Sequence, residues 1–376
     1  MLRESLAAFR PPTALITGGA GQDGLHLAEL LLAKGYRVLA MVRPGGSSEP
    51  RRQARLGQLL ADAGGRLEAR VGDLSDMAAL LRLLQQARPD EIYNLAALSH
   101  VGRSFDLPLA TFDVNAAGVL RLLEAVRLAG LLPTVRFYQA STAELFGMPE
   151  RERLDETAPF RPCSPYGAAK LAAYWAVDGY RRAYGLRASN GILFNHESPL
   201  RGRDFVSRKV CRAAAAFASG RRSRPLALGN LGAVRDWGHA RDHVEGIWRM
   251  VRLAPGEDFV LATGEGRSVR HLAEAAFRAA GQPIAWLGAG PDERGVETST
   301  GRTRIVVDTA LIRPTDPPRL VGDAGAARDR LDWRPRKAFS DMIAEMVAAE
   351  MADMPGAGLE DAEGSAGRQI DAPADG

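Results

Sequence analysis

The stretch Thr13-Ala14-Leu15-Ile16-Thr17-Gly18-Gly19-Ala20-Gly21-Gln22-Asp23-Gly24 decides how this chain folds. Its first five residues form an apolar run that favours a β-strand, and helical periodicity follows over residues 26–34 until Gly35. Glycines at 18, 21 and 24 would let the backbone and the helix N-terminus approach a pyrophosphate. A tight turn without a ligand is the alternative. Because a strand and a helix flank the glycines, we predict a dinucleotide site that includes Gly18, Gly21, Gln22, Asp23 and Gly24.

The alternation of strand and helix continues along the first half of the chain. Further strands are predicted at 37–42, 67–71, 91–95 and 135–140, and helices at 77–87, 108–129 and 166–184. Such alternation is typical of a parallel sheet with helices on both faces. We therefore predict an α/β fold, a Rossmann-type doubly wound parallel sheet, with residues 12–197 as the NADP-binding domain.

The rhythm loosens from about Ser198. Arginine-rich segments and turns are followed by a predicted strand at 258–263 and predicted helices at 268–280 and 339–351. We interpret 198–352 as mainly a smaller C-terminal substrate-binding lobe, with later segments returning to the main sheet. Residues 353–376 have few large apolar side chains, and we expect a disordered tail.

Composition narrows the class of protein. The 376 residues carry 49 basic and 45 acidic side chains that are spread along the chain, which is weak support for nucleic-acid binding. No apolar run reaches the roughly 18 residues of a membrane span, and residues 1–12 lack a secretory signal, so we expect a cytoplasmic protein without a membrane partner. We interpret Cys163 and Cys211 as free thiols, and the scattered histidines as not forming a metal site.

The residue after the second strand bears on the cofactor. A carboxylate there usually binds the ribose hydroxyls of NAD, whereas this chain has Arg43. A guanidinium would pair with the 2′-phosphate of NADP, and Arg51, Arg52 or Arg55 could assist. A solvated basic loop is the alternative. Residues after the third and fourth strands should line the rest of the cofactor site: Asp73, Leu74, Leu95, Ala97 and Ser99.

Tyr166 and Lys170 lie four residues apart on a predicted helix and so share one face. A tyrosine with its ordinary pKa of about 10 is a poor base near neutrality unless a cation stabilises its phenolate. Lys170 can supply that cation and can also hold the nicotinamide ribose. We predict that this pair removes a proton from an alcohol.

Ser141, Thr142 and Glu144 follow a predicted strand whose carboxyl end faces the ligand crevice in a sheet of this type. The hydroxyl of Thr142 can position a substrate, and the carboxylate of Glu144 is a second proton-transfer group. Oxidation at one sugar carbon acidifies the neighbouring C–H bond, so Glu144 could drive loss of water. A surface turn is the alternative.

These residues carry a resemblance to a known family. The chain resembles the extended short-chain dehydrogenase/reductases, and within them the GDP-mannose 4,6-dehydratases, from Ala14 to about Met351. Beyond the motifs above, the resemblance rests on longer stretches: 91–95, 99–101, 137–142, Asn190-Gly191-Ile192-Leu193-Phe194-Asn195-His196-Glu197-Ser198-Pro199, Arg235-Asp236-Trp237-Gly238-His239-Ala240 and Arg313-Pro314-Thr315.

The resemblance implies a reaction and roles for single residues. Bound NADP+ would take hydride from C4 of the mannosyl unit while Tyr166 accepts the O4 proton, and Glu144 would then remove the C5 proton and help the C6 hydroxyl to leave. Hydride would return to C6, giving GDP-4-dehydro-6-deoxy-D-mannose. Further contacts are implied for the cofactor by His196 and Arg201, and for the nucleotide sugar by Ser99, Asn195, Lys209, Arg235 and Arg313. Pairing of the helices at 108–129 and 166–184 across a two-fold axis implies a homodimer or a homotetramer.

The sequence departs from the family pattern at several positions: Pro44, Leu98, Ala110, Ala143 and Leu200. These departures leave open a dehydratase for another nucleotide sugar such as a GDP-heptose, or an epimerase or reductase of the same fold. Glu144 argues against the last two, because an epimerase has no elimination step for this carboxylate. A non-catalytic NADP-sensing protein would not need Tyr166, Lys170 and Glu144 together.

Overall fold

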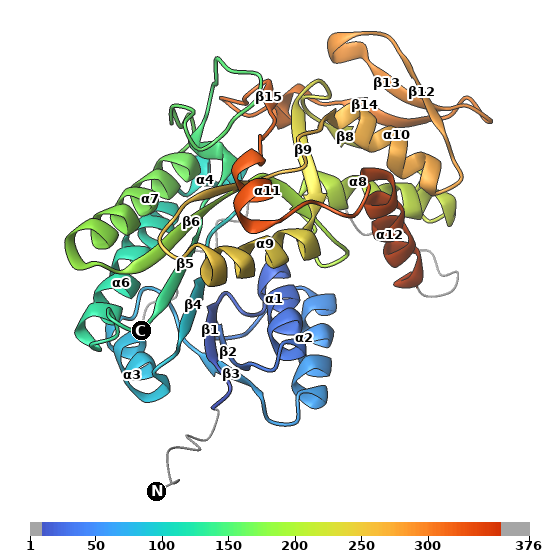
Figure 1. The fold of residues 1–376 in the computed structure, drawn as a ribbon. Helices are drawn as coiled ribbons and strands as arrows, with labels where there is room; N and C mark the ends of the chain where they lie inside the picture. Colours follow the sequence, from blue (N-terminus) through green and yellow to red (C-terminus); the bar gives the residue numbers. More distant parts are fainter. Residues whose placement is uncertain (1–9, 355–376) are drawn as a thin grey trace, which may run out of the picture.

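The structure of the protein is a computed structural model that describes residues 10–354 (Figure 1). The predicted tail at 353–376 lies outside the described residues except for Asp353 and Met354. Strands and helices alternate through the first half of the chain, as β1 Thr13–Thr17, α1 Gln22–Ala33, β2 Arg37–Val42, α2 Pro50–Asp62, β3 Leu67–Val71, α3 Met77–Ala87, β4 Glu91–Asn94, α4 Val101–Asp106, α5 Pro108–Phe112, α6 Gly118–Leu128, β5 Arg136–Ala140, α7 Pro165–Tyr184 and β6 Arg187–Leu193.

The main sheet has seven parallel strands in the order β10-β6-β5-β4-β1-β2-β3, where β10 is Phe259–Leu261. Strand order reverses between β1 and β4, which is the switch point of the doubly wound nucleotide-binding fold. The predicted fold class is therefore confirmed. Ligands of such sheets bind at the carboxyl ends of the strands next to this switch point.

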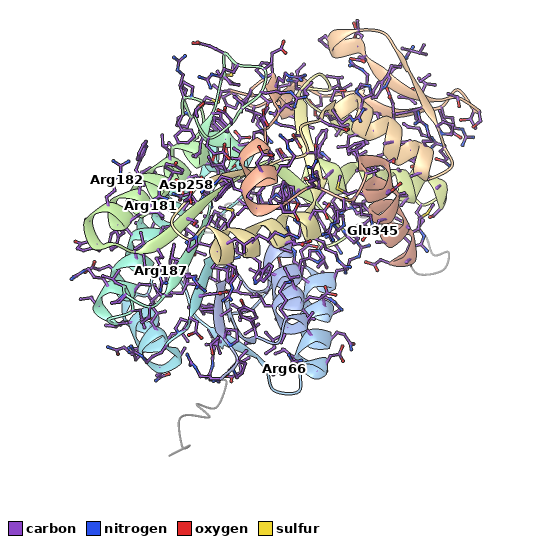
Figure 2. All side chains as sticks on the ribbon, viewed as in Figure 1. Arg66, Arg181, Arg182, Arg187, Asp258 and Glu345 are labelled. Carbon is purple, nitrogen blue, oxygen red and sulfur yellow. The ribbon has the colours of Figure 1, made fainter. Side chains whose placement is uncertain are left out.

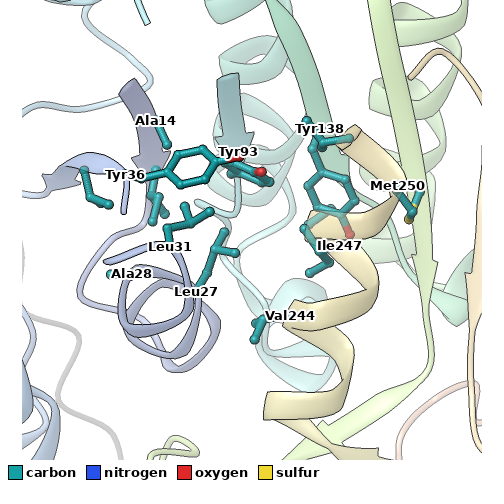
Figure 3. Close-up of a cluster of buried hydrophobic side chains, with 14 of the residues drawn as sticks. Ala14, Leu27, Ala28, Leu31, Tyr36, Tyr93, Tyr138, Val244, Ile247 and Met250 are labelled. Atoms are coloured by element: carbon teal, nitrogen blue, oxygen red, sulfur yellow. The ribbon is translucent and has the colours of Figure 1, made fainter. Parts of the chain in front are cut away.

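Alternate side chains of β1 pack in two separate hydrophobic clusters. Ala14 and Ile16 of β1 pack in a cluster with side chains of α1 and of α9 (Ala240–Leu253), whereas Leu15 between them joins a cluster with α3, α6 and α7. Figure 3 shows the first cluster, in which Tyr93 of β4 and Tyr138 of β5 lie with their ring centroids 6.3 Å apart over α1 and α9. Both faces of the sheet are thus covered by helices.

The second half of the chain forms smaller sheets beside the main one (Figure 1). One sheet joins β9 (Val234–His239) to β7 (Asn195–Glu197), β11 (Gly266–Ser268) and β15 (Arg319–Leu320). Another consists of β12 Ile284–Leu287, β13 Arg294–Glu297, β14 Thr303–Val307 and β8 Leu226–Leu228. Their core is shared with α8 Val206–Ala218, α10 Val269–Ala279 and α12 Phe339–Ala352, and α11 Gly325–Leu331 packs on α9.

The strand predicted at 258–263 is β10, and it belongs to the main sheet. Asp258 just before it accepts from the guanidinium of Arg181 on α7 at 2.9 Å, which ties this edge strand to a helix (Figure 2). The helix predicted at 108–129 is interrupted by a π-helical turn, η1 Asp113–Ala117. Among the described residues, none of the helices combines the length and apolar character that crossing a bilayer requires.

Candidate active site

One cavity of about 670 Å³ lies at the carboxyl ends of β1, β4 and β5 and continues between the main sheet and the smaller sheets. Its volume is in the range of ligand pockets. The site residues predicted from the sequence line this cavity, with the exception of the suggested helpers Arg51 and Arg55; their individual roles stay predictions. They are Gly18, Gly21, Gln22, Asp23, Gly24, Arg43, Asp73, Leu74, Leu95, Ala97, Ser99, Thr142, Glu144, Tyr166, Lys170, Asn195, His196, Arg201, Lys209, Arg235 and Arg313.

The glycine turn brings backbone close to backbone. Gly18 has φ +69°, and a Cβ there would lie 3.0 Å from the Cα of Ala96 after β4. A Cβ on Gly24 would lie 2.4 Å from the carbonyl oxygen of Gly18. Helix α1 begins directly after Gly21, and no side chain caps its first turn. Its first amide N–H groups and its dipole can therefore meet an anionic ligand.

The far end of the cavity carries basic side chains. Arg43 follows β2 and is exposed at the rim, with Asp73 nearby after β3. Of the three arginines suggested as helpers, only Arg52 lines the cavity. The expectation for Arg51 and Arg55 needs correction, because Arg51 is engaged by Glu350 and Arg55 by Glu29.

Tyr166 and Lys170 both lie buried on the first turns of α7. The Lys170 Nζ donates to the carbonyl oxygen of Ala140 at 2.8 Å and lies 6.0 Å from the centroid of the Tyr166 ring. Burial lowers the pKa of Lys170 to about 8. Burial raises the pKa of Tyr166 to about 12, and a hydrogen bond with Thr142 partly offsets this. The phenol, the ammonium group and the threonine hydroxyl thus face one part of the cavity.

Glu144 presents an unpaired carboxyl group to the same cavity. It lies in a short 3-10 turn, Ala143–Leu145, capped by Thr142, whose Oγ1 accepts from the Glu144 backbone N–H at 3.2 Å. The Glu144 Oε2 atom is buried and has no hydrogen-bond partner among the described residues. Burial raises the pKa of Glu144, and the positive charges of Arg235 and Arg313 counteract that rise. Such a carboxyl group is suited to both accept and donate a proton.

Arg235 and Arg313 meet at the side of the cavity opposite the sheet. Both pair with Asp316, at 2.7 Å from Arg235 Nη2 and at 3.5 Å from Arg313 Nη1. Arg235 Nη1 also donates to the carbonyl oxygen of Pro317 at 2.8 Å, which fixes the direction of its guanidinium. Two oriented arginines beside a carboxyl-bearing pocket fit a diphosphate ligand.

Comparison with known proteins decides the family. Residues 15–346 match the family model described as GDP-mannose 4,6 dehydratase. The chain belongs to this dehydratase family. It is 49% identical over 343 residues to the GDP-mannose 4,6-dehydratase of Sinorhizobium fredii (strain HH103), covering 91% of this chain and 97% of that relative. It is 48% identical over 339 residues to the human GDP-mannose 4,6 dehydratase, covering 90% of this chain and 91% of that relative.

Solved structures place the dehydratase-family chain among sugar-nucleotide enzymes of the extended short-chain dehydrogenase/reductase fold. It is similar to the UDP-glucose 4-epimerase of Thermus thermophilus in complex with NAD (TM-score 0.75, 27% identity, covering 91% and 100%). It is also similar to the dTDP-glucose 4,6-dehydratase of Streptomyces venezuelae with NAD bound (TM-score 0.74, 26% identity, covering 91% and 97%). A third structure, RMD from Pseudomonas aeruginosa with NADPH, shows the shared fold alone at 20% identity.

A nicotinamide cofactor of the kind these neighbours hold fits the residues of this family member. The first turn of α1, which has no side-chain cap among the described residues, offers N–H donors for a pyrophosphate, and Lys170 lines the cavity. The Ser141 Oγ is buried without a hydrogen-bond partner among residues 10–354, although it lines the cavity. An orphaned donor of this kind indicates that a ligand atom completes the site.

His196 links the first turn of α1 to the small sheet that contains β7 and β9. Its Nε2 lies 2.8 Å from Asp23 Oδ2 in the first turn of α1, and its own strand, β7, pairs with β9 beside Arg235. Burial alone would lower the pKa of His196, but the charge of Asp23 and the hydrogen bond raise it. The same ion pair lowers the pKa of Asp23 despite burial.

Sequence reasoning missed several residues, among them Asp316, which lines the cavity, and Asn115, which supports its wall. Asp316 contacts both arginines, and its only signal was its place three residues after Arg313. Asn115 in the π turn accepts from the Leu98 N–H at 2.8 Å and donates to the Leu98 carbonyl oxygen at 2.9 Å. It thereby fixes the loop after β4 that lines the cavity, and the local sequence around Asn115 does not predict this contact.

Proposed function

We propose that this chain converts GDP-mannose to GDP-4-dehydro-6-deoxy-D-mannose, with NADP as its bound cofactor. The observation that carries the proposal is the Oε2 atom of Glu144, which is buried and has no hydrogen-bond partner among residues 10–354, in the same cavity as Tyr166 and Lys170. Bound NADP would supply the hydride acceptor and donor, so the cofactor is not consumed. Membership of the family, and relatives at 49% and 48% identity named GDP-mannose 4,6-dehydratase, support this choice.

The first proton transfer falls to Tyr166. Its phenolic oxygen would accept the proton of the sugar O4 as C4 is oxidised, and the hydroxyl of Thr142 would orient the sugar by a hydrogen bond. The ammonium group of Lys170, whose Nζ lies 6.0 Å from the centroid of the Tyr166 ring, would stabilise negative charge on the phenolic oxygen. Burial favours the neutral phenol, so a cation at this place would assist the proton transfer near neutral pH.

Elimination of water falls to Glu144. A ketone at C4 acidifies the C5–H bond, and the carboxylate takes that proton. The C6–O bond then breaks, and the proton on Glu144 leaves with the hydroxyl as water, so atoms and charge balance. Because burial raises the pKa of Glu144, its carboxylate is a stronger base than a solvated one, and it can hold the proton until the hydroxyl departs.

Cofactor choice rests on the basic end of the cavity. The position after β2 carries Arg43, not the carboxylate that favours NAD, and Arg52 and Ser47 line the cavity beside it. Guanidinium groups suit the additional 2′-phosphate of NADP. Neighbouring structures contain either NAD or NADPH, so the assignment to NADP rests on these side chains.

The nucleotide end would be held by Arg235, Arg313, Lys209 and Asn195, with Ser99 nearer the sugar. Arginine forks match phosphate oxygens. Leu98 also lines the cavity, where the resemblance implies a glutamine, and Ala110 on α5 stands where it implies a tyrosine; the loss of these polar side chains favours, as a second candidate, a related nucleotide sugar such as a GDP-heptose.

We also propose a homodimer, or a homotetramer built from it. Exposed apolar side chains gather on α5, α6 and α7, which pack against one another directly or through η1. They include Leu109, which is 85% exposed, Phe112, Leu120, Trp175 and Tyr184. Sedimentation velocity should give at least twice the mass of one chain; the mass of one chain at micromolar concentration would contradict this.

A cytoplasmic location is proposed because both cysteines are unpaired.

The function is tested by incubating the protein with GDP-mannose and either NADP or NAD. We expect a product about 18 mass units lighter, a loss that follows from the removal of water, with its 4-keto group detected by borohydride reduction. NADP should support turnover at about tenfold lower concentration than NAD, because the 2′-phosphate adds a charged contact. No product from GDP-mannose but product from a GDP-heptose would move the assignment to the second candidate.

A further inference from the structure

A buried ion-pair network joins the cofactor half of the molecule to its last helix. Glu350 on α12 accepts from Arg51 Nη1 at 2.6 Å and from Arg208 Nε at 2.8 Å. Arg208 Nη1 continues to Glu49 Oε2 at 2.9 Å, just before α2. The side chains of Arg208 and Glu350 are only 2% and 6% exposed, so water cannot replace these partners.

The network also holds the segment 199–203, which follows β7. Arg51 Nη1 donates to the Pro199 carbonyl oxygen at 3.1 Å, and the neighbouring Arg52 donates from Nε to the Leu200 carbonyl oxygen at 2.7 Å. From the other side, the Arg203 N–H donates to Glu49 Oε1 at 3.2 Å. The first turn of α2 and this segment are therefore held against each other.

Both of the segments held in this way contribute to the cavity wall. Arg52 lines it from α2, and Arg201 lines it from the 199–203 segment. Burial lowers the pKa of Arg52, and the charges of Arg201 and Arg208 lower it further, which shows how closely these cations are crowded. Glu350, together with Asp353 and Glu49, supplies the negative charge beside which Arg51 and Arg208 lie, and Glu350 is the carboxylate that these two arginines share.

We propose that Glu350 is a positioning residue for the cofactor: by holding Arg51 and Arg208, it keeps Arg52 and Arg201 directed into the cavity. Glu350 does not line the cavity itself, so it acts through the arginines and not by contact with the ligand. Removal of its charge leaves the buried Arg208 and the 13% exposed Arg51 without the carboxylate that they share; Arg208 keeps Glu49 and Arg51 keeps Asp353, and we expect the two guanidinium groups to move apart. The proposal rests on the proposed function only in taking NADP as the ligand.

Loss of the Glu350 carboxylate also has an electrostatic effect that would strengthen the binding of NADP, because it makes the surroundings more positive and so attracts phosphate. We expect the loss of order in the arginines to outweigh it, since Glu350 contacts Arg51 and Arg208 directly and, unlike Arg52 and Arg201, does not line the cavity. An arginine that is not held in place loses much of the advantage of its fork geometry.

The test is equilibrium binding of NADP to the full-length Glu350→Gln variant, followed by the quenching of intrinsic tryptophan fluorescence. We expect the Kd to rise about tenfold. In turnover with saturating NADP, kcat should stay within about threefold, because the catalytic groups are untouched. Glu345→Gln is the matched control: Glu345 lies on the same helix and pairs with Lys337 and with His239 at 3.5 Å, away from α2 (Figure 2).

The outcomes separate the alternatives. An unchanged Kd in Glu350→Gln, with or without a lower melting temperature, would overturn the proposal and leave Glu350 a purely structural residue. Should that variant not fold, Glu350→Asp takes its place, because aspartate keeps the negative charge on a side chain that is shorter by one methylene group. The Kd for NADP is then expected to rise about threefold, and an unchanged Kd overturns the proposal. If the wild-type protein itself does not bind NADP, the proposed cofactor fails and not this network.

Discussion

Replacing Glu144 by glutamine should lower the turnover of GDP-mannose by about 10²–10⁴-fold. Glutamine has the same shape and can still form hydrogen bonds, but at neutral pH it neither accepts the C5 proton nor donates a proton to the departing hydroxyl. The buried position of the wild-type carboxyl group, with Oε2 unpaired among the described residues, leaves it free for both tasks. Release of the 4-keto product, measured by mass spectrometry, is the readout.

A second readout isolates the elimination step. In D2O the wild-type product should carry solvent deuterium at C5, because the proton there is removed and replaced, and Glu144→Gln should lose this exchange. Glu150→Gln is the matched control, since Glu150 is 78% exposed and pairs with Arg161 outside the cavity. Turnover above about a tenth of wild type in Glu144→Gln would contradict the elimination role.

Replacing Tyr166 by phenylalanine should cost about 10²–10⁴-fold in turnover as well, for a different reason. The ring stays in its buried place, but no oxygen remains to accept the O4 proton, so the sugar cannot be oxidised at C4. Because Lys170 donates to the Ala140 carbonyl oxygen and not to the phenol, the variant should keep the lysine in place. The affinity for NADP, measured by fluorescence, should change less than about threefold.

Tyr174→Phe provides the comparison for that variant. Tyr174 lies on the same helix, two turns after Tyr166, and packs on Phe160 with ring centroids 5.0 Å apart, away from the catalytic groups. Its turnover should remain near wild type. A Tyr166→Phe variant that works as fast as Tyr174→Phe would mean that another group takes the O4 proton.

The fold was predictable where local sequence and tertiary structure agree. Strands β1, β2 and β3 have the predicted bounds because each is a short run with apolar side chains ended by turn residues. Helix α2 was missed because its thirteen residues are polar on the whole and only Leu59 among them is buried, so few apolar side chains mark the helix in the sequence. The π turn in the helix after Pro108 was missed too; its Asn115 bonds to Leu98, 17 residues earlier, and the local sequence does not show this contact.

The residues of the candidate site were likewise predictable where they form a local motif and were missed where they depend on contacts between distant segments. Gly18, Tyr166 and Lys170 were found because their chemistry depends on spacing within one segment. Asp316 was missed, because its meaning lies in two arginines that only the folded chain brings together. The exclusion of Arg51 from the cavity likewise depends on Glu350, at the other end of the described chain.

The ion pair between Arg51 and Glu350 spans 299 positions of the chain. During synthesis the nucleotide-binding half leaves the ribosome long before α12, and a domain can begin to fold as it emerges. The contacts of Glu350 with Arg51 and Arg208 cannot form until α12 has been synthesised, so the ion-pair network beside the arginine-lined wall of the cavity is completed late. A chain released before residue 350 would therefore lack the carboxylate that holds Arg51 and Arg208.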